Sequence, residues 1–264
     1  MIPAINDTDM KTPVLHAEGT GCDRSSGTSH SGNGGTAVSP SPAPLRVSVS
    51  DEIRAICPGF AGAVVEADVR NAPTPPELWD EINALAKEFS QKYTPETLKL
   101  QPGIAATRSA YKTAGKDPSR YRPACEQLAR RILQGKGLYS VSTLVDIGNL
   151  ASIRSGYSTG AIDRDKIRGN EVILGIGCKD EPYEAIGRGT LNIENMPAYR
   201  DAEGAFATPT SDNVRTMLSE GTRRLALFIN GYDGDRERVM TTARYVQELL
   251  KKYAESDGGD ITCY

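Results

Sequence analysis

The sequence predicts an α+β domain, with helices layered on a large mixed sheet, preceded by a disordered N-terminal tail. Short apolar runs at 172–176 and 225–229 are typical of buried strands, whereas apolar residues at helical spacing elsewhere indicate amphipathic helices. These segments follow one another without a regular β-α-β rhythm, which favours a mixed sheet over a doubly wound one. The domain is expected to span residues 45–254, between a disordered tail at 1–44 and a flexible C-terminus at 255–264.

The predicted tail differs from the rest of the chain in composition. It is rich in Gly, Ser and Pro, as in the runs 32–35 and 39–44, so it carries too little apolar area to offset the entropy of ordering it. Its basic side chains are Lys11 and Arg24, which argues against an Arg-rich transit peptide.

Ordered structure is predicted to begin with a strand at 45–49, where apolar and polar residues alternate, and a second strand at 63–67. A helix then opens at Pro75 and Pro76, because proline fits the first turn of a helix. The apolar stripe of this helix consists of Leu78, Ile82, Leu85 and Phe89.

Three more helices are predicted further along the chain. One covers 123–134 and stops before Gly135, and the next covers about 142–155 and stops before Gly156. Glycine favours such stops because it adopts the left-handed conformation that ends many helices. The last helix runs from about 236 to 253.

Composition limits the classes of function. The chain has 264 residues and a net charge of −3, so any RNA must bind a local patch rather than the molecule as a whole. Aromatic residues make up 6% of the chain, too few for a surface built mainly on base stacking. The five cysteines are scattered without a Cys-x-x-Cys pair, so no metal or other cofactor is expected, and a reducing, cytoplasmic setting is indicated. No apolar stretch reaches roughly eighteen residues, so no membrane partner is expected.

Residues 156–160, Gly-Tyr-Ser-Thr-Gly, match the Gly-x-Ser-x-Gly pattern of a nucleophile elbow. An elbow needs a preceding strand and a later histidine that activates the serine. Here a helix precedes the pattern, and the histidines, His16 and His30, both lie upstream in the tail. We therefore interpret the pattern as a glycine-flanked loop.

A basic segment covers residues 108–136. It carries eight Lys or Arg side chains against Asp117 and Glu126, an excess of six positive charges. The segment is the best candidate for a surface that contacts phosphates, although a solvated helix face with pairs such as Glu126–Arg130 would give the same pattern. The candidate RNA-binding residues are Arg108, Lys112, Lys116, Arg120, Arg122, Arg130 and Arg131.

Four motifs carry a resemblance to a known family. They are Arg-Tyr-Arg-Pro at 120–123, Leu-Val-Asp-Ile-Gly-Asn-Leu at 144–150, Gly-Ala-Ile-Asp-Arg-Asp-Lys-Ile-Arg-Gly at 160–169 and Pro-Thr-Ser-Asp at 209–212. In this order they resemble the "B three–four" editing domain of the phenylalanyl-tRNA synthetase beta subunit, a PheT/TilS-like domain. They resemble even more closely the free-standing proteins that carry only that domain.

The resemblance implies a layered α+β fold and a role in tRNA chemistry. In the synthetase, this domain hydrolyses tyrosine wrongly attached to tRNA by positioning a water and the ribose hydroxyl, without a protein nucleophile. The implied partner is tRNA or aminoacyl-tRNA, with a free amino acid as an alternative, and no obligate protein partner is indicated. The implied pocket residues are Asn149, Arg154, Gly160, Asp163, Thr208, Ser211, Asp212 and Thr216.

Two departures from the family pattern bear on activity. The synthetase has a histidine at the position of Gly160 and a glutamate at that of Phe228 or Ile229, and both line its pocket. The chain also carries no synthetase catalytic module, so it is not expected to charge tRNA.

Three functions therefore stay open. A trans-acting hydrolase would release an amino acid from a mischarged tRNA, whereas a non-catalytic module would bind tRNA or an amino acid, in the case of tRNA with an affinity that falls with salt. A small-molecule enzyme on the same fold would be stabilised by a metabolite but not by tRNA.

Overall fold

Two four-stranded sheets, a small hairpin and six α-helices make up residues 43–264, the part of the chain that this computed structural model describes. The predicted tail, apart from its last two residues, lies outside the described residues. The helices are α1 (Asp51–Ile56), α2 (Pro76–Lys92), α3 (Pro102–Thr113), α4 (Ala124–Leu133), α5 (Thr143–Ser155) and α6 (Arg236–Tyr253), with 3₁₀ turns η1 (Leu98–Leu100), η2 (Arg164–Lys166) and η3 (Val214–Thr216). The strands are β1 (Arg46–Val49), β2 (Ala61–Asp68), β3 (Thr159–Asp163), β4 (Glu171–Ile176), β5 (Glu184–Ala185), β6 (Gly189–Thr190), β7 (Pro197–Arg200), β8 (Ala205–Ala207), β9 (Arg224–Gly231) and β10 (Asp260–Cys263).

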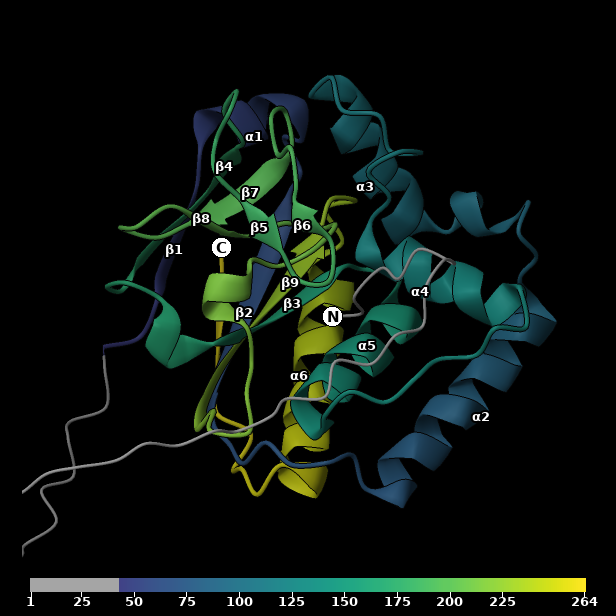
Figure 1. Ribbon diagram of the computed structural model, residues 1–264. Coiled ribbons are helices and arrows are strands. Elements are labelled where there is room, and N and C mark those ends of the chain that lie inside the picture. Colours follow the sequence, from purple (N-terminus) through teal and green to yellow (C-terminus); the bar gives the residue numbers. More distant parts are fainter. Residues whose placement is uncertain (1–42) are drawn as a thin grey trace, which may run out of the picture.

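The central sheet has the strand order β10-β2-β9-β3, and all of its pairings are antiparallel. The second sheet, β1-β4-β7-β8, combines a parallel β1–β4 pair with antiparallel neighbours, and β5 and β6 form a separate hairpin. The predicted α+β class with a mixed sheet is therefore confirmed, with the strands divided between two sheets (Figure 1).

Alternate residues of β9 face two different hydrophobic cores. Leu225, Leu227 and Ile229 belong to the cluster that β9 shares with α5 and α6. Ala226 and Phe228 belong to the cluster that it shares with the second sheet. Helices thus cover one face of the central sheet and the second sheet covers the other (Figure 1). Burial on both faces explains why this strand is a continuous apolar run instead of an alternating pattern.

Local signals in the sequence fix several helix ends. Asp235 caps α6 by accepting a hydrogen bond from the Arg238 N–H (2.9 Å). α5 ends at Gly156, which has a left-handed φ of 77° as its C-cap. The predicted helices at 123–134, 142–155 and 236–253 are confirmed as α4, α5 and α6, each within a residue at either end.

The sequence analysis did not predict α3. Its second residue, Gly103, weakens the helical signal, yet this glycine is needed for packing. A Cβ at position 103 would lie only 2.7 Å from the Gly156 carbonyl oxygen. The absence of a side chain therefore lets the start of α3 approach the end of α5.

The predicted flexible C-terminus was wrong for residues 260–263, which form β10 along the edge of β2. Tyr264 extends the pairing, since its N–H donates to the Gly62 carbonyl (3.0 Å) and its carbonyl accepts from the Gly62 N–H (2.9 Å). The Tyr264 ring occupies the space beside Gly62 that a side chain there would need. Its hydroxyl lies 2.7 Å from that of Tyr199.

We expect Tyr264→Ala to destabilise the fold by roughly 2 kcal/mol, because the ring packs in the core between the sheets. Tyr264→Phe keeps the ring and loses one hydroxyl contact, so its cost should be about 1 kcal/mol or less. Urea unfolding of both variants against the parent chain measures the difference. Equal stability of the Ala variant and the parent would contradict a structural role for the C-terminal strand.

Candidate functional site

The loop between β8 and η3, residues 208–213, is held by its own threonine. Thr208 Oγ1 accepts hydrogen bonds from the N–H groups of Thr210 (3.2 Å) and Ser211 (3.1 Å). The same hydroxyl donates to the Ser211 carbonyl (2.9 Å). A hydroxyl that bonds the backbone two and three residues further on stabilises a tight turn, so the residues after Thr208 are fixed in space.

Two tyrosines attach this loop to the rest of the domain. The Tyr183 hydroxyl donates to the Ser211 carbonyl (2.8 Å), and the Tyr111 and Thr210 hydroxyls lie 2.9 Å apart. Thr210 also bonds to the Tyr121 carbonyl (3.1 Å). Tyr111 comes from α3 and Tyr183 from the segment before β5, so two distant parts of the chain hold one turn.

Asp212 is carried by this loop to the side of β3. A Cβ at Gly160 would lie 3.3 Å from Asp212 Oδ1, so the carboxyl occupies the space beside the bare backbone of this strand. Asp212 is only 1% exposed, and its burial raises the pKa of the carboxyl to about 8. We call Gly160, Ser211 and Asp212 the carboxyl centre.

The carboxyl centre has the properties of a proton-transfer site. A carboxyl with a pKa near 8 exchanges its proton close to neutral pH, which suits general acid–base chemistry. The hydroxyl of the preceding residue, Ser211, is also buried and has no hydrogen-bond partner within residues 43–264. Buried hydroxyls are usually satisfied, so this one is available to a ligand.

Ser158, in the Gly-x-Ser-x-Gly pattern, is not an activated nucleophile. Its hydroxyl bonds to Cys125 Sγ (3.4 Å) and accepts from the Cys125 N–H (3.4 Å), which ties the start of β3 to α4. Burial raises the pKa of the Cys125 thiol to about 12, so the thiol stays protonated. No histidine occurs among residues 43–264 to act as a base for Ser158.

The predicted pocket residues Thr208, Ser211 and Asp212 lie together in the same loop, next to Gly160 on β3. Thr216 continues that loop, and its buried hydroxyl donates to the Phe206 carbonyl (3.4 Å). Asn149 is buried in α5, one residue after Gly148, where α5 packs on β3.

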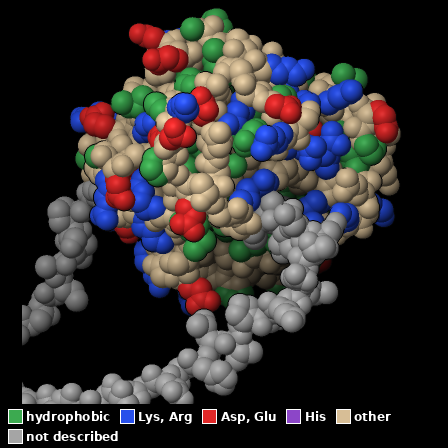
Figure 2. Space-filling model, turned by 45° about the horizontal axis from the view of Figure 1, so that its top comes forward, with side chains coloured by type: hydrophobic (Ala, Val, Ile, Leu, Met, Phe, Trp, Pro, Cys, Tyr) green, Lys and Arg blue, Asp and Glu red, His purple; other side chains and the backbone are tan. Residues whose placement is uncertain are grey.

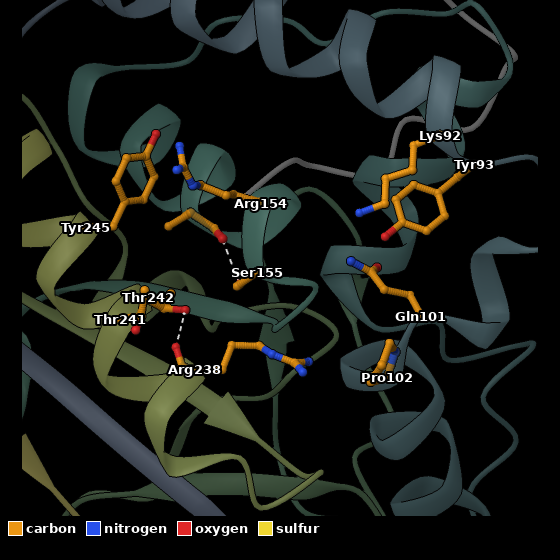
Figure 3. Close-up of a pocket in the computed structure, with 11 residues that line it drawn as sticks. Lys92, Tyr93, Gln101, Pro102, Arg154, Ser155, Arg238, Thr241, Thr242 and Tyr245 are labelled. Atoms are coloured by element: carbon orange, nitrogen blue, oxygen red, sulfur yellow. Dashed lines mark hydrogen bonds between the residues drawn. The ribbon is translucent and has the colours of Figure 1, made fainter.

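Two further predicted pocket residues lie apart from the carboxyl centre. Asp163 is three residues after Gly160, an odd offset that puts its side chain on the opposite face of β3. Its carboxylate accepts from the Thr222 hydroxyl (2.8 Å) and caps η2. Arg154 lies at the end of α5, with its guanidinium 4.4 Å from the centre of the Tyr245 ring, in the pocket of Figure 3.

Glu126 organises three of the predicted RNA-binding arginines. Its side chain is fully buried in α4 and pairs with Arg108 and Arg130, each at 2.9 Å. Arg122 Nε lies 3.8 Å from the same carboxylate. The expected pair Glu126–Arg130 is present, and these arginines brace α3 against α4 as well as carrying charge towards the surface.

Lys116 is anchored too, because its ammonium donates to the carbonyls of Asn192 (2.8 Å) and Glu194 (2.7 Å). Among the other predicted cations, Lys112 and Arg120 are exposed. Figure 2 shows one face of the molecule. On the half of it that lies over α3 and α4, Lys and Arg side chains are more frequent than Asp and Glu side chains.

Sequence reasoning missed Arg188, in the turn between β5 and β6. Its guanidinium donates to Gln127 Oε1, and Gln127 in turn donates to the carbonyls of Arg122 (2.7 Å) and Thr210 (3.4 Å). Burial and the neighbouring Arg122 lower the pKa of Arg188. The buried Nε of each arginine makes no hydrogen bond within the described residues. We call Arg122 and Arg188 the guanidinium pair, which lies beside the loop that carries Asp212.

Other kinds of site were sought in the same part of the chain. No group of three or more His, Cys, Asp or Glu side chains among residues 43–264 is arranged to hold a metal ion. None of the helices in that range is both long and apolar enough to cross a membrane.

Comparison with known proteins identifies a family. The model of the B3/4 domain matches residues 106–255, more than half of the chain. Among solved structures, an N-terminal fragment of the phenylalanyl-tRNA synthetase beta subunit from Pyrococcus horikoshii aligns with 16% identity and a TM-score of 0.41. The alignment covers 84% of this chain and 52% of that fragment, so the chain spans about half the fragment's length. No curated protein matches the sequence.

The raised pKa of Asp212 predicts how stability depends on pH. The folded protein keeps this proton up to about pH 8, whereas an unfolded carboxyl loses it near 3.8, so the contribution of Asp212 to stability falls as pH rises between these values. Asp212→Asn cannot ionise and should lose less stability than the parent from pH 5 to pH 8. Urea unfolding at both pH values tests this, and parallel losses in the two proteins would contradict it.

Proposed function

Because the chain belongs to the B3/4 domain family, we propose that it is a trans-acting hydrolase that releases a wrongly attached amino acid from a tRNA. The observation that carries the proposal is the carboxyl centre, where a buried carboxyl with a pKa near 8 follows a serine whose buried hydroxyl makes no hydrogen bond within residues 43–264. The substrate class comes from the resemblance of residues 144–150 and 160–169 to the editing domain.

The proposed reaction needs no protein nucleophile. A water attacks the ester carbonyl that joins the amino acid to the ribose, and the Asp212 carboxylate takes the proton that the water gives up. The C–O bond to the ribose then breaks, and the proton is passed to the leaving ribose oxygen, which leaves a free amino acid and an uncharged tRNA. Ser211 donates its free hydroxyl to an oxygen of the ester, and the ribose's own second hydroxyl helps to orient the water.

Asp212 can supply the titratable group that the family's histidine provides and that this chain lacks at position 160. The synthetase has a histidine at the position of Gly160, and here the Asp212 carboxyl lies 3.3 Å from where a Cβ at 160 would begin. A titratable group is thus kept beside the same point of β3, although it comes from a different segment. This supports retained acid–base chemistry rather than an emptied pocket.

The guanidinium pair would hold the backbone of the tRNA near the ester. Arg122 and Arg188 come from two different elements and present buried N–H donors that lack hydrogen-bond partners within residues 43–264. Guanidinium groups bind phosphate oxygens through paired N–H donors. Gln127 links this pair to the Thr210 carbonyl, so a bound phosphate would be positioned relative to Asp212.

The second candidate function is a non-catalytic module that binds tRNA or a free amino acid. It is favoured by the apolar residues Phe228 and Ile229 where the family places a glutamate. Enzymatic action on a small molecule is a third candidate, and the acidic balance of the chain favours it slightly. Turnover separates the first candidate from the second, and the absence of any tRNA interaction would select the third.

We predict that the full chain releases the amino acid from one species in a panel of correctly and wrongly charged tRNAs, with Tyr-tRNA(Phe) included. Asp212→Asn should lower that rate by about 100-fold or more, because a positioned acid–base group typically contributes that much. The matched control is Asp180→Asn, an exposed Asp with a positive φ of 56° that asparagine also adopts readily. Radiolabel release at pH 7 and pH 9 measures both variants.

Two outcomes would reject parts of this proposal. Release from no charged tRNA, together with measurable tRNA binding, would establish the binding module instead. Release that Asp212→Asn leaves unchanged would keep the hydrolase and remove Asp212 from its mechanism.

We also predict that Arg188→Ala weakens tRNA binding and reduces the salt slope of log K by about 1, because one phosphate contact is lost. Arg244→Ala, at an exposed position of α6, is the control and should leave both quantities unchanged. Charge reversal at Arg130 is a poor test, because it would place a second carboxylate against that of the buried Glu126. Filter binding across a salt series gives the slopes, and equal slopes for Arg188→Ala and the parent would exclude a phosphate contact.

A further inference from the structure

A separate pocket lies at the C-terminal end of α5, and none of its lining residues belongs to the carboxyl centre. Its volume is about 400 Å³, within the range of cavities that hold small ligands. The ends of α2 and α5, the start of α3 and one side of α6 form its walls (Figure 3). The side chains that matter here are Lys92, Tyr93, Gln101, Arg154, Arg238 and Tyr245.

The charge of this pocket is positive. Lys92, Arg154 and Arg238 line it, and no Asp or Glu does so among the described residues. Arg238 is already paired with Asp233 (3.1 Å) and Asp235 (3.0 Å).

Lys92 and Arg154 instead lie against aromatic rings, those of Tyr93 and Tyr245 respectively, and neither makes an ion pair within residues 43–264. The Lys92 ammonium thus remains for an anion, whereas the Arg154 guanidinium is directed towards Tyr245 (Figure 3) and its charge also lowers the pKa of Glu81.

The polar groups that face the space are mostly donors. Figure 3 shows the Lys92 ammonium and the Gln101 side-chain nitrogen pointing into the pocket, with the Arg238 guanidinium directed towards the same space. The Ser155 and Thr242 hydroxyls are already used, because each donates to a backbone carbonyl of its own helix at 2.7 Å. Because N–H donors line the pocket, it is complementary to a ligand rich in oxygen acceptors. A phosphate can accept hydrogen bonds from Lys and Arg side chains together.

The size of the pocket indicates that the ligand is larger than phosphate. A lone phosphate would leave most of the roughly 400 Å³ unfilled. The partly buried rings of Tyr93 and Tyr245 offer apolar surface to a planar group.

We propose that this pocket binds a nucleotide, with the phosphate held by Lys92 and Arg238 and the base beside Tyr93. The nucleotide is either free or the phosphorylated end of an RNA strand, since both present the same chemistry. The site does not depend on the proposed deacylation, because its residues are separate from Ser211 and Asp212.

The test is calorimetric titration of the full chain with AMP, adenosine and inorganic phosphate. AMP should bind at least tenfold more tightly than either fragment, because it alone engages the cations and the rings together. The double variant Lys92→Ala/Arg238→Ala should weaken AMP binding by about 100-fold, roughly tenfold for each charge-assisted contact. The matched control is Lys87→Ala/Arg244→Ala, two exposed cations on α2 and α6 that do not line the pocket, and its affinity should stay within about twofold of the parent.

A 5′-phosphorylated RNA tetranucleotide distinguishes the two sources. If it displaces AMP and binds more tightly, the ligand is an RNA end, whereas weaker binding than AMP assigns a free nucleotide. Binding of neither, or AMP binding that the double variant leaves unchanged while thermal unfolding confirms that it is folded, would overturn the proposal. Equal affinity for AMP and inorganic phosphate would overturn the assignment to a nucleotide.

Discussion

The burial of β9 on both faces is the constraint on which the other layers depend. This strand is hydrogen-bonded to β2 on one edge and to β3 on the other, so its backbone is satisfied without water. Its side chains alternate between the helical core and the core between the sheets, and its apolar residues are almost completely excluded from solvent. Because neither face can be left open, both the helix pair α5–α6 and the second sheet are needed for stability.

The burial of β9 on both faces also limits which polar groups the interior can hold. Asn230, near the end of β9, accepts from the Tyr199 hydroxyl (2.8 Å) and donates to the Ser158 carbonyl (2.9 Å), so one amide joins the second sheet to the start of β3. Polar groups in such a dry interior are stable only when they are bonded, or when they stay neutral. The burial that completes the core also raises the pKa of the Asp212 carboxyl into the neutral range. A titratable group near neutrality is therefore a direct result of the three-layer packing.

Sequence reasoning succeeded where the signal is local. The apolar run 225–229 and the helix 236–253 are encoded by neighbouring residues, and Glu126–Arg130 is a single turn apart. It failed where the partner is distant. Arg46 and Glu171 of the parallel β1–β4 pair are 125 positions apart, and the turn that holds Arg188 gives no sign of Gln127, 61 positions away. In the candidate site, the sequence motifs predicted both Gly160 and Asp212 as pocket residues. Only the fold shows that the Asp212 carboxyl fills the space beside Gly160.

The distribution of charge explains how a chain with a net charge of −3 could still bind anions at two places. Such a molecule gains no long-range attraction for RNA, and exposed charges act only over the Debye length of about 8 Å at physiological salt. Affinity must then come from cations that the fold already holds at the binding site before the ligand binds. Glu126 does this for Arg122, the Tyr93 ring does it for Lys92, and the carboxylates of Asp233 and Asp235 do it for Arg238. Since few cations act at each place, binding at either should depend only weakly on salt and strongly on geometry.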